Sequence, residues 1–276
     1  MTKQSGWQAS LDLTFTFEDG RIVLRDNRHV GPLVIQKTLY PEGNQTCHAI
    51  IVHPPGGILE GDNLAINAQL APQAHVLFTT PGATRWYKSA GAQASQRVHI
   101  QAGAYASVKW LPQETIYFEH THAKNLVDIA LAADSRFIGW EIACLGRRLA
   151  GEAFLAGRVQ QSLRVFVDGR PVFIEQGTLA ASDAALASPV GFGDNAVYAT
   201  FVAYAEGLSP ALLEQCRQCV APSDLKVGLT LMGKVLVGRA MGKSPEATRA
   251  IFTEWWKIIR ETVCQRVAVE PRIWQT

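Results

Sequence analysis

The residues best equipped for chemistry lie in two turn-rich stretches of the first third of the chain. The first runs from His53 to Asp62 (HPPGGILEGD) and the second from Thr79 to Ser89 (TTPGATRWYKS). Proline fixes φ at about −65° and glycine tolerates positive φ, so both stretches encode a defined backbone path rather than a flexible linker. Their turn-forming residues are Pro54, Pro55, Gly56, Gly57, Gly61, Thr80, Pro81 and Gly82. His53 offers either a metal ligand or a hydrogen bond to a turn carbonyl.

Neither stretch matches a catalytic loop. The first lacks the Gly-Lys-Ser/Thr ending of a phosphate-binding loop, and the chain contains no GxSxG elbow and no HExxH zinc motif. One enzymatic hypothesis remains open: an enzyme that binds a small anionic ligand at the two turns, with Arg85 and Lys88 as the anion clamp. This hypothesis predicts a compact pocket where His53, Asp62 and Arg85 meet.

Two short clusters of metal-ligating side chains also have ordinary structural explanations. Cys216 and Cys219 form a CxxC pair without the second pair that a zinc site needs, and their flanks predict a short helix. His120 and His122 would share one face of a strand, about 7 Å apart at Cα, where they could chelate a divalent ion. A helix that carries two cysteines and a solvated surface loop are the commoner explanations.

Two carboxylates stand inside apolar runs, Glu141 in FIGWEIACLG and Glu175 in PVFIEQGTL. A carboxylate in such a place must be paired, protonated or in contact with a wet cavity. The first condition would be met by an ion pair with Arg136, Arg147 or Arg148. The third would be met by a transient cation site inside a channel. The sequence leaves both explanations open.

The composition is that of a globular chain, with 47% hydrophobic and 18% charged residues among 276. The net charge of +2 comes without a basic block, so we expect no binding to nucleic acid or to an anionic membrane. No apolar run is long enough to span a bilayer, and the first residues show no hydrophobic signal region. Five scattered cysteines suit a reducing compartment. We therefore expect a soluble, cytoplasmic protein.

The hydrophobic pattern predicts more than ten short strands before any helix. Residues 9–17 alternate apolar and polar side chains, and similar short runs continue towards the loop at 180–195. This spacing favours a sandwich, a barrel or an irregular solenoid over a doubly wound α/β fold. Ser-Pro start signals predict helices at about 209–220 and 244–266. We expect one domain over residues 1–276.

The second predicted helix carries an aromatic stripe that includes Phe252, Trp255 and Trp256. The stripe either packs on the helix's own sheet or anchors a partner protein through exposed aromatic rings. The loop at 180–195 is a second candidate for a partner surface. The sequence does not decide between packing and docking.

Five segments occur in order along the chain. They are HPPGG with Gly61-Asp62, TTPGAT from Thr79, WLPQETI from Trp110 with Pro112 and Glu114, Gly146-Arg147 with Gly151-Glu152 and Phe154, and Pro271-Arg272-Ile273-Trp274. Together they resemble the UreD family of urease accessory proteins, called UreH in some organisms, over essentially the whole chain. Some positions depart from the family pattern: Glu60 replaces a usual glycine, and Lys109 replaces a usual acidic residue. Arg85, Trp86 and Lys88 are conservative variants of lysine, phenylalanine and arginine.

The resemblance implies a mainly β fold, a single irregular β-solenoid or β-helix-like domain of many short strands with about two helices near the C-terminal part. It implies a non-enzymatic scaffold that binds apo-urease and the accessory protein UreF, which recruits the GTPase UreG. Ni²⁺ would pass through an internal tunnel to the urease active site as transient cargo, with no tightly bound cofactor. The residues expected to hold it briefly are His53, Asp62, Glu141 and Glu175, with Asp62 the strongest choice. Transfer requires weak sites, so we predict no tight metal site.

Overall fold

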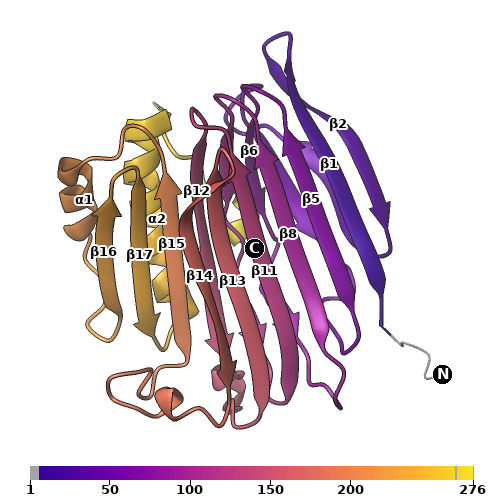
Figure 1. The fold of residues 1–276 in the computed structure, drawn as a ribbon, viewed down its shortest axis with the longest axis vertical. Helices are drawn as coiled ribbons and strands as arrows, with labels where there is room; N and C mark the ends of the chain where they lie inside the picture. The colour runs from indigo at the N-terminus through magenta and orange to yellow at the C-terminus, as the bar shows by residue number, and fades with distance from the viewer. Residues whose placement is uncertain (1–5, 265, 276) are drawn as a thin grey trace.

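A computed structural model describes residues 6–264 and 266–275 as two facing β-sheets, with the two α-helices at one end (Figure 1). The described strands of sheet A follow the order β14 (Arg170–Ala180), β13 (Gly157–Val167), β11 (Thr121–Leu131), β8 (Ala94–Ala102), β5 (Asn63–Leu70), β1 (Gln8–Glu18) and β2 (Arg21–Val30). Those of sheet B follow the order β16 (Lys226–Met232), β17 (Val235–Gly242), β15 (Val197–Tyr204), β12 (Arg136–Leu145), β9 (Ser107–Trp110), β6 (His75–Thr79), β4 (Cys47–Val52) and β3 (Val34–Leu39). Two short strands, β7 (Thr84–Trp86) and β10 (Thr115–Tyr117), pair at the side of sheet B.

The middle of both sheets is a β-solenoid. The chain passes back and forth between the sheets, so β5, β8, β11 and β13 become parallel neighbours in sheet A, and β4, β6, β9 and β12 do so in sheet B. Strands β7 and β10 form a third parallel ladder at one corner of the coils. Antiparallel partners follow at each end, β2 and β14 in sheet A and β3 and β15 in sheet B. The expected mainly β, solenoid-like fold is confirmed.

The main hydrophobic core lies between the two sheets. Every second side chain of β11 is buried, and the side chains between them are half-exposed, as a strand with one inward face requires. Strand β1 shows the alternation expected for residues 9–17 and buries Leu11, Leu13 and Phe15. The ring of Phe15 meets that of Phe78 from sheet B edge-on, with 5.6 Å between the ring centroids. Apolar burial between the sheets therefore sets which strand face points inward.

The two α-helices begin where the Ser-Pro signals predict them. Helix α1 spans Pro210–Arg217, and the Ser209 hydroxyl accepts a hydrogen bond from the amide of Leu212. Helix α2 spans Pro245–Cys264 and begins after Ser244, whose hydroxyl accepts from the amide of Ala247 at 3.0 Å. Three-residue and four-residue 3₁₀ turns also occur at Arg148–Ala150, Ala184–Leu186 and Arg272–Gln275. Within the described residues, no helix has both the length and the hydropathy needed to span a bilayer.

Helix α2 buries its aromatic stripe against the outer face of sheet B. Phe252, Trp255 and Trp256 are each at most 1% exposed. The rings of Phe252 and Trp255 lie 5.6 and 5.9 Å from that of Phe201 on β15. The hypothesis that these rings anchor a partner protein is therefore wrong. Sheet B presents Trp140 and other apolar side chains on this face, and the helix removes them from water.

A buried charge network fixes the C-terminal half of α2. Arg260 is fully buried and donates to the carboxylate of Glu42, which also contacts Nε2 of His48 at 2.6 Å. Burial alone would raise the pKa of Glu42, but the hydrogen bonds from His48 and Arg260 outweigh it and lower the pKa to about 2. Burial also lowers the pKa of the neighbouring Lys109 to about 8. Glu42 is thus the anion that compensates the buried guanidinium.

Replacing Glu42 by glutamine should destabilise the fold strongly, because it leaves the Arg260 charge buried without its anion. Loss of one partner of a buried ion pair costs about 3 to 5 kcal/mol. The matched control is Glu214→Gln, which breaks an exposed pair with Arg217 on α1 and should cost less than about 1 kcal/mol. Urea unfolding monitored by tryptophan fluorescence measures both values. Equal losses in the two variants would contradict this account of α2.

Candidate functional site

A stripe of polar side chains crosses the apolar core of the sandwich. In sheet A, Gln96, Asn125 and Gln161 are direct cross-strand neighbours on β8, β11 and β13. They stand on the inward face, in line with the buried apolar residues of the same strands. The amide of Gln96 donates to Oδ1 of Asn125 at 3.3 Å. Sheet A therefore offers a row of amides to the interior at one level of the coils.

Sheet B supplies a matching row of charged and hydroxyl side chains. Glu141, Thr200 and Arg239 are direct neighbours on β12, β15 and β17. Their positions alternate with outward-facing residues, so all three project towards sheet A. The row brings the carboxylate of Glu141 and the hydroxyl of Thr200 to the cavity between the sheets, whereas the side chain of Arg239 is 59% exposed.

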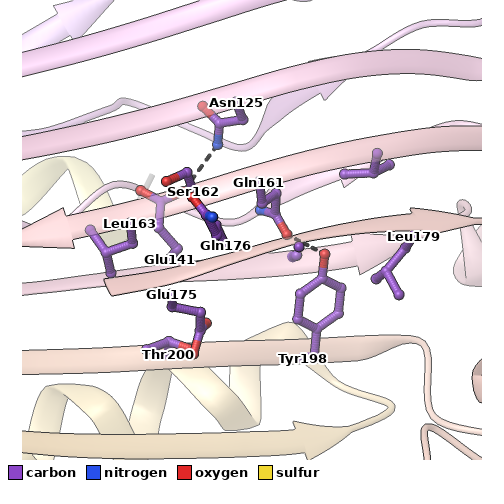
Figure 2. Close-up of a pocket in the computed structure, with 13 residues that line it drawn as sticks. Asn125, Glu141, Gln161, Ser162, Leu163, Glu175, Gln176, Leu179, Tyr198 and Thr200 are labelled. Atoms are coloured by element: carbon purple, nitrogen blue, oxygen red, sulfur yellow. Dashed lines mark hydrogen bonds between the residues drawn. The ribbon is translucent and has the colours of Figure 1, made fainter. Parts of the chain in front are cut away.

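Glu141 is held at the centre of this stripe by two hydrogen bonds. Nε1 of Trp110 donates to Oε1 at 2.7 Å. Nδ2 of Asn125 donates to Oε2 at 3.1 Å (Figure 2). Burial raises the pKa of Glu141 to about 7, and the two hydrogen bonds only partly oppose it. Among the described residues no cation pairs with Glu141, so an ion pair with the nearby arginines is not what stabilises it; Arg147 pairs with Glu152 instead.

Two cavities adjoin at Glu141. One has a volume of about 200 Å³ and lies between the sheets; its lining includes Asn125, Glu141, Gln161, Glu175, Tyr198 and Thr200 (Figure 2). The other has a volume of about 230 Å³; its lining includes His53, Thr80, Arg85, Gln96, Trp110 and Glu141. The Glu141 carboxylate is shared by both linings. His53 therefore lines one cavity, Glu175 lines the other, and Glu141 lines both.

Glu175 also lines the first cavity. Its Oε1 accepts a hydrogen bond from the Thr200 hydroxyl at 2.6 Å, and its Oε2 faces the guanidinium of Arg239 in an ion pair. The arginine that pairs with Glu175 is therefore on β17, far along the chain from Arg136, Arg147 and Arg148, which the sequence had offered. Glu175 also borders a shallower hollow on the outer side, lined by Arg239 and Lys226.

His53 and Asp62 are close in space but differ in their surroundings. Burial lowers the pKa of His53, and the nearby Asp62 partly opposes this; Nε2 of the ring is buried without a hydrogen-bond partner. Asp62 is 1% exposed, and its two oxygens accept from the amides of Trp7 at 2.7 Å and Leu59 at 2.8 Å. Asp62 closes the turn and lines neither of the two cavities. The sequence could not reveal that both of its oxygens are already used.

The turn-rich stretches stack on one corner of successive coils. The amide of Ile58 donates to the carbonyl of Arg85 at 2.7 Å, β7 then pairs with β10, and β10 pairs with the end of β12. Gly57 is required here because a Cβ would lie 2.2 Å from the Tyr87 ring. Gly146 is required because it has φ of +80° and a Cβ would meet the Glu152 carbonyl at 2.5 Å. The stacking of these stretches at one corner is a feature of the solenoid.

The family model described as UreD urease accessory protein matches residues 8–275. The chain belongs to the UreD family. It is 48% identical over 273 residues to a urease accessory protein UreD of Dechloromonas aromatica (strain RCB), a match that covers 98% of this chain and 95% of the relative. It is 37% identical over 273 residues to a urease accessory protein UreD of Klebsiella aerogenes, with 99% and 98% covered. The resemblance drawn from five segments is confirmed, and the chain has a role in urease maturation.

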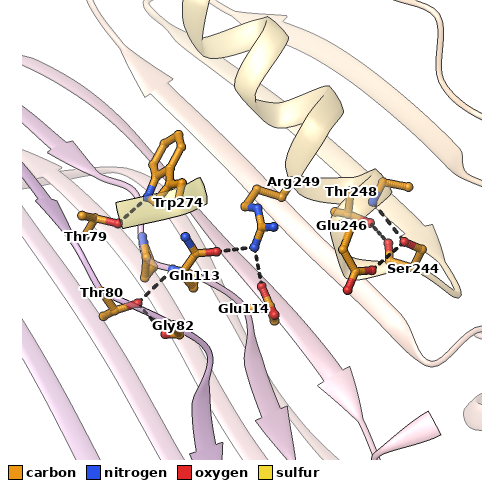
Figure 3. A network of polar contacts seen from close by, with 12 residues as sticks. Thr79, Thr80, Gly82, Gln113, Glu114, Ser244, Glu246, Thr248, Arg249 and Trp274 are labelled. Atoms are coloured by element: carbon orange, nitrogen blue, oxygen red, sulfur yellow. Dashed lines mark hydrogen bonds and ion pairs between the residues drawn. The ribbon is translucent and has the colours of Figure 1, made fainter. Parts of the chain in front are cut away.

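The segment WLPQETI lines a cavity through Trp110 and Pro112, and its residues Gln113 and Glu114 contact Arg249 of helix α2 (Figure 3). Trp110 reaches Glu141, as described above, while Glu114 accepts from Arg249 on α2 at 2.8 Å. The side-chain oxygen of Gln113 also accepts from Arg249, and the backbone amide of Gln113 donates to the Thr80 hydroxyl at 3.0 Å. Glu114 therefore has a structural partner, which fits its place among the predicted structural residues. The same segment contacts both the cavity and the helix that covers sheet B.

The remaining hypotheses about metal and anion sites find less support. His120 has φ of +63° in the turn before β11, which begins at Thr121, so His120 and His122 do not share a strand face. That expectation was wrong because the strand starts one residue later. Cys219 lies beyond the end of α1, while Cys216 is buried within it. No group of three or more metal-ligating side chains occurs among the described residues.

The anion-clamp hypothesis required a pocket where three side chains meet. His53 and Arg85 do line the same cavity, but Asp62 does not, because it closes the turn, and Lys88 does not line that cavity either. The expected convergence is therefore not found. Membership of a family of accessory proteins fits a non-catalytic role.

The raised pKa of Glu141 predicts a pH-dependent stability. Between pH values of about 4.5 and about 7 the folded protein holds a proton that the unfolded chain has lost. The free energy of unfolding should therefore fall as the pH rises through this window, by up to about 1.4 kcal/mol per pH unit. Glu141→Gln removes the titration, so the difference in the free energy of unfolding between the wild type and the variant should change between pH values of about 4.5 and about 7 and be flat outside this window.

Urea unfolding at a series of pH values measures this difference. Trp110→Phe is a useful companion variant because it removes a hydrogen bond that lowers the pKa of Glu141. The window should then extend to higher pH. Parallel pH profiles for the wild type and Glu141→Gln would show that Glu141 has an ordinary pKa.

Proposed function

We propose that this chain is a non-enzymatic scaffold that passes Ni²⁺ towards apo-urease through the cavities between its sheets. The family membership supports a role in urease maturation. The observation that carries the proposal is that Glu141 borders both cavities, with His53 on one side and Glu175 on the other. A carboxylate inside an apolar sandwich costs free energy. A path for a cation would explain why a carboxylate is present at this position.

The chemistry of these side chains suits a cation in transit. Carboxylates, amides and an imidazole can each contribute one ligand to a borderline divalent ion. They are spread along the cavities rather than gathered into a cage, so none of them would hold Ni²⁺ tightly. Binding at Glu141 requires the ionised carboxylate, so a passing cation would displace a proton. Ni²⁺ is therefore transient cargo in this proposal and not a resident cofactor.

The proposed partners are apo-urease and the accessory protein UreF, with the GTPase UreG bound through UreF. With the aromatic stripe of α2 buried, the loop between β14 and β15 remains the proposed partner surface. Val190 in this loop is 99% exposed. The proposal places the assembly in the cytoplasm and involves neither nucleic acid nor membrane.

Glu141→Leu and Glu175→Leu should each block nickel-dependent activation of urease while complex formation survives. Leucine has a similar volume, but it cannot ligate a cation and it makes the path apolar. Co-expression with urease and its accessory proteins, followed by measurement of urease activity and nickel content, tests the effect. A pull-down from the same cells tests whether the complex forms.

The matched control is Asp128→Asn. Asp128 lies on β11, like Asn125, but pairs with Arg164 on the outer face of sheet A. It should leave activation near the wild-type level. If both leucine variants delivered nickel normally, the proposed path would be wrong.

A further inference from the structure

Arg239 covers a carboxylate oxygen that has no other strong contact. Oε1 of Glu175 accepts from the Thr200 hydroxyl. Oε2 is buried and accepts no directed hydrogen bond, although the guanidinium of Arg239 lies within ion-pair range. The Arg239 side chain itself is 59% exposed. A buried anionic oxygen is thus covered by the charged end of a side chain that reaches into solvent.

The strand register explains why Arg239 lies at this position. Arg239 and Thr200 are direct neighbours on β17 and β15, and Thr200 is the neighbour of Glu141 on β12. Glu175 faces this row from β14 on sheet A. Glu175 and Thr200 line both the cavity next to Glu141 and the outer hollow, whereas Arg239 lines the outer hollow alone. The ion pair between Glu175 and Arg239 therefore lies where the inner cavity and the outer hollow meet.

The chemistry of arginine fits a displaceable cover. A guanidinium keeps its charge at every physiological pH, so Arg239 occupies Glu175 as a tethered cation. An ion pair with an exposed partner is weak and is easily exchanged for water. A divalent cation carries twice the charge and can compete for the same oxygens. Arg239 would then swing into the outer hollow without any need to lose a proton.

We propose that Arg239 is a gate residue that competes with a divalent cation for Glu175 at the outer end of the inter-sheet path. The inference rests on the proposed nickel path and adds to it a residue that controls entry or exit. The guanidinium closes the end of the path when no cation is present and keeps the buried oxygen paired. A borderline divalent ion such as Ni²⁺ opens it by taking its place.

Arg239→Gln in the full chain tests the competition directly. The variant should bind Ni²⁺ up to about fivefold more tightly than the wild type, which is the scale of an exposed ion pair. Isothermal titration with Ni²⁺ alone measures the change. The gain should vanish in the double variant Arg239→Gln with Glu175→Gln. Arg239→Lys, which keeps a tethered cation, should restore an affinity close to that of the wild type.

Lys226→Gln is the matched control, because Lys226 lines the same outer hollow but forms no ion pair with Glu175. It removes the same charge and should leave the Ni²⁺ affinity nearly unchanged. An equal gain in Ni²⁺ affinity in Lys226→Gln, or a gain that persists without Glu175, would show that the loss of any positive charge has this effect. Either result would contradict the proposal that Arg239 is a gate. An unchanged affinity in Arg239→Gln would also overturn it.

The failure of the gate can be told apart from failure of the path. If Glu141→Leu and Glu175→Leu block urease activation but Arg239→Gln binds Ni²⁺ as the wild type does, the path stands and the gate is wrong. If the leucine variants activate urease normally, the path itself is wrong and so is a gate upon it. Thermal unfolding of each variant checks that the fold is intact.

Discussion

The backbone hydrogen bonds between parallel coils are the constraint on which the rest of this structure depends. The backbone N–H and C=O groups of a strand form hydrogen bonds with neighbouring strands, so each coil requires the next one at a fixed register. In sheet A the register runs unbroken from β5 through β8 and β11 to β13. Because of it, side chains at equivalent positions of successive coils form straight rows. Antiparallel strands flank the parallel ladders at each end.

The polar stripe is a direct product of these rows. Gln96, Asn125 and Gln161 come from separate coils, yet the register places them side by side. Facing them, Glu141 obtains one hydrogen bond from sheet A and one from its own sheet, through Asn125 and Trp110. A buried carboxylate is tolerable when its acceptors are used in this way. The cavities on either side persist because the sheets cannot close over a row of polar side chains without leaving them unpaired.

Local patterns in the sequence were sufficient for the elements but not for the site. The alternation around Leu13 and the Ser-Pro signals at Ser209 and Ser244 depend on neighbours a few residues away, and they placed a strand and two helices correctly. Glu141 and Glu175 could be singled out because a carboxylate is unusual in an apolar run. Their partners Asn125 and Arg239 lie on other strands, and no local pattern indicates which strands meet.

The same distinction explains the turn residues. The glycines of HPPGG predict a fixed turn, and the Tyr87 ring indeed leaves no room for a Cβ at Gly57. Whether Asp62 is free to touch a ligand depends on two amides, those of Trp7 and Leu59, and only the folded chain shows that both are bonded to it. His120 illustrates a limit of another kind. A strand boundary that differs by one residue removes an imidazole from the strand face.

The hydrogen bond from Trp274 to Thr79 joins positions 195 residues apart and has a consequence for biosynthesis. Thr79 belongs to an early coil, so it leaves the ribosome long before Trp274 has been made. Until then the outer face of sheet B, with Trp140 at its centre, lacks both α2 and the indole that packs 5.8 Å away. A growing chain that has completed β12, β15 and β17 therefore exposes this apolar face until the last residues are made. Transiently exposed apolar surface of this kind makes a folding chain prone to aggregation.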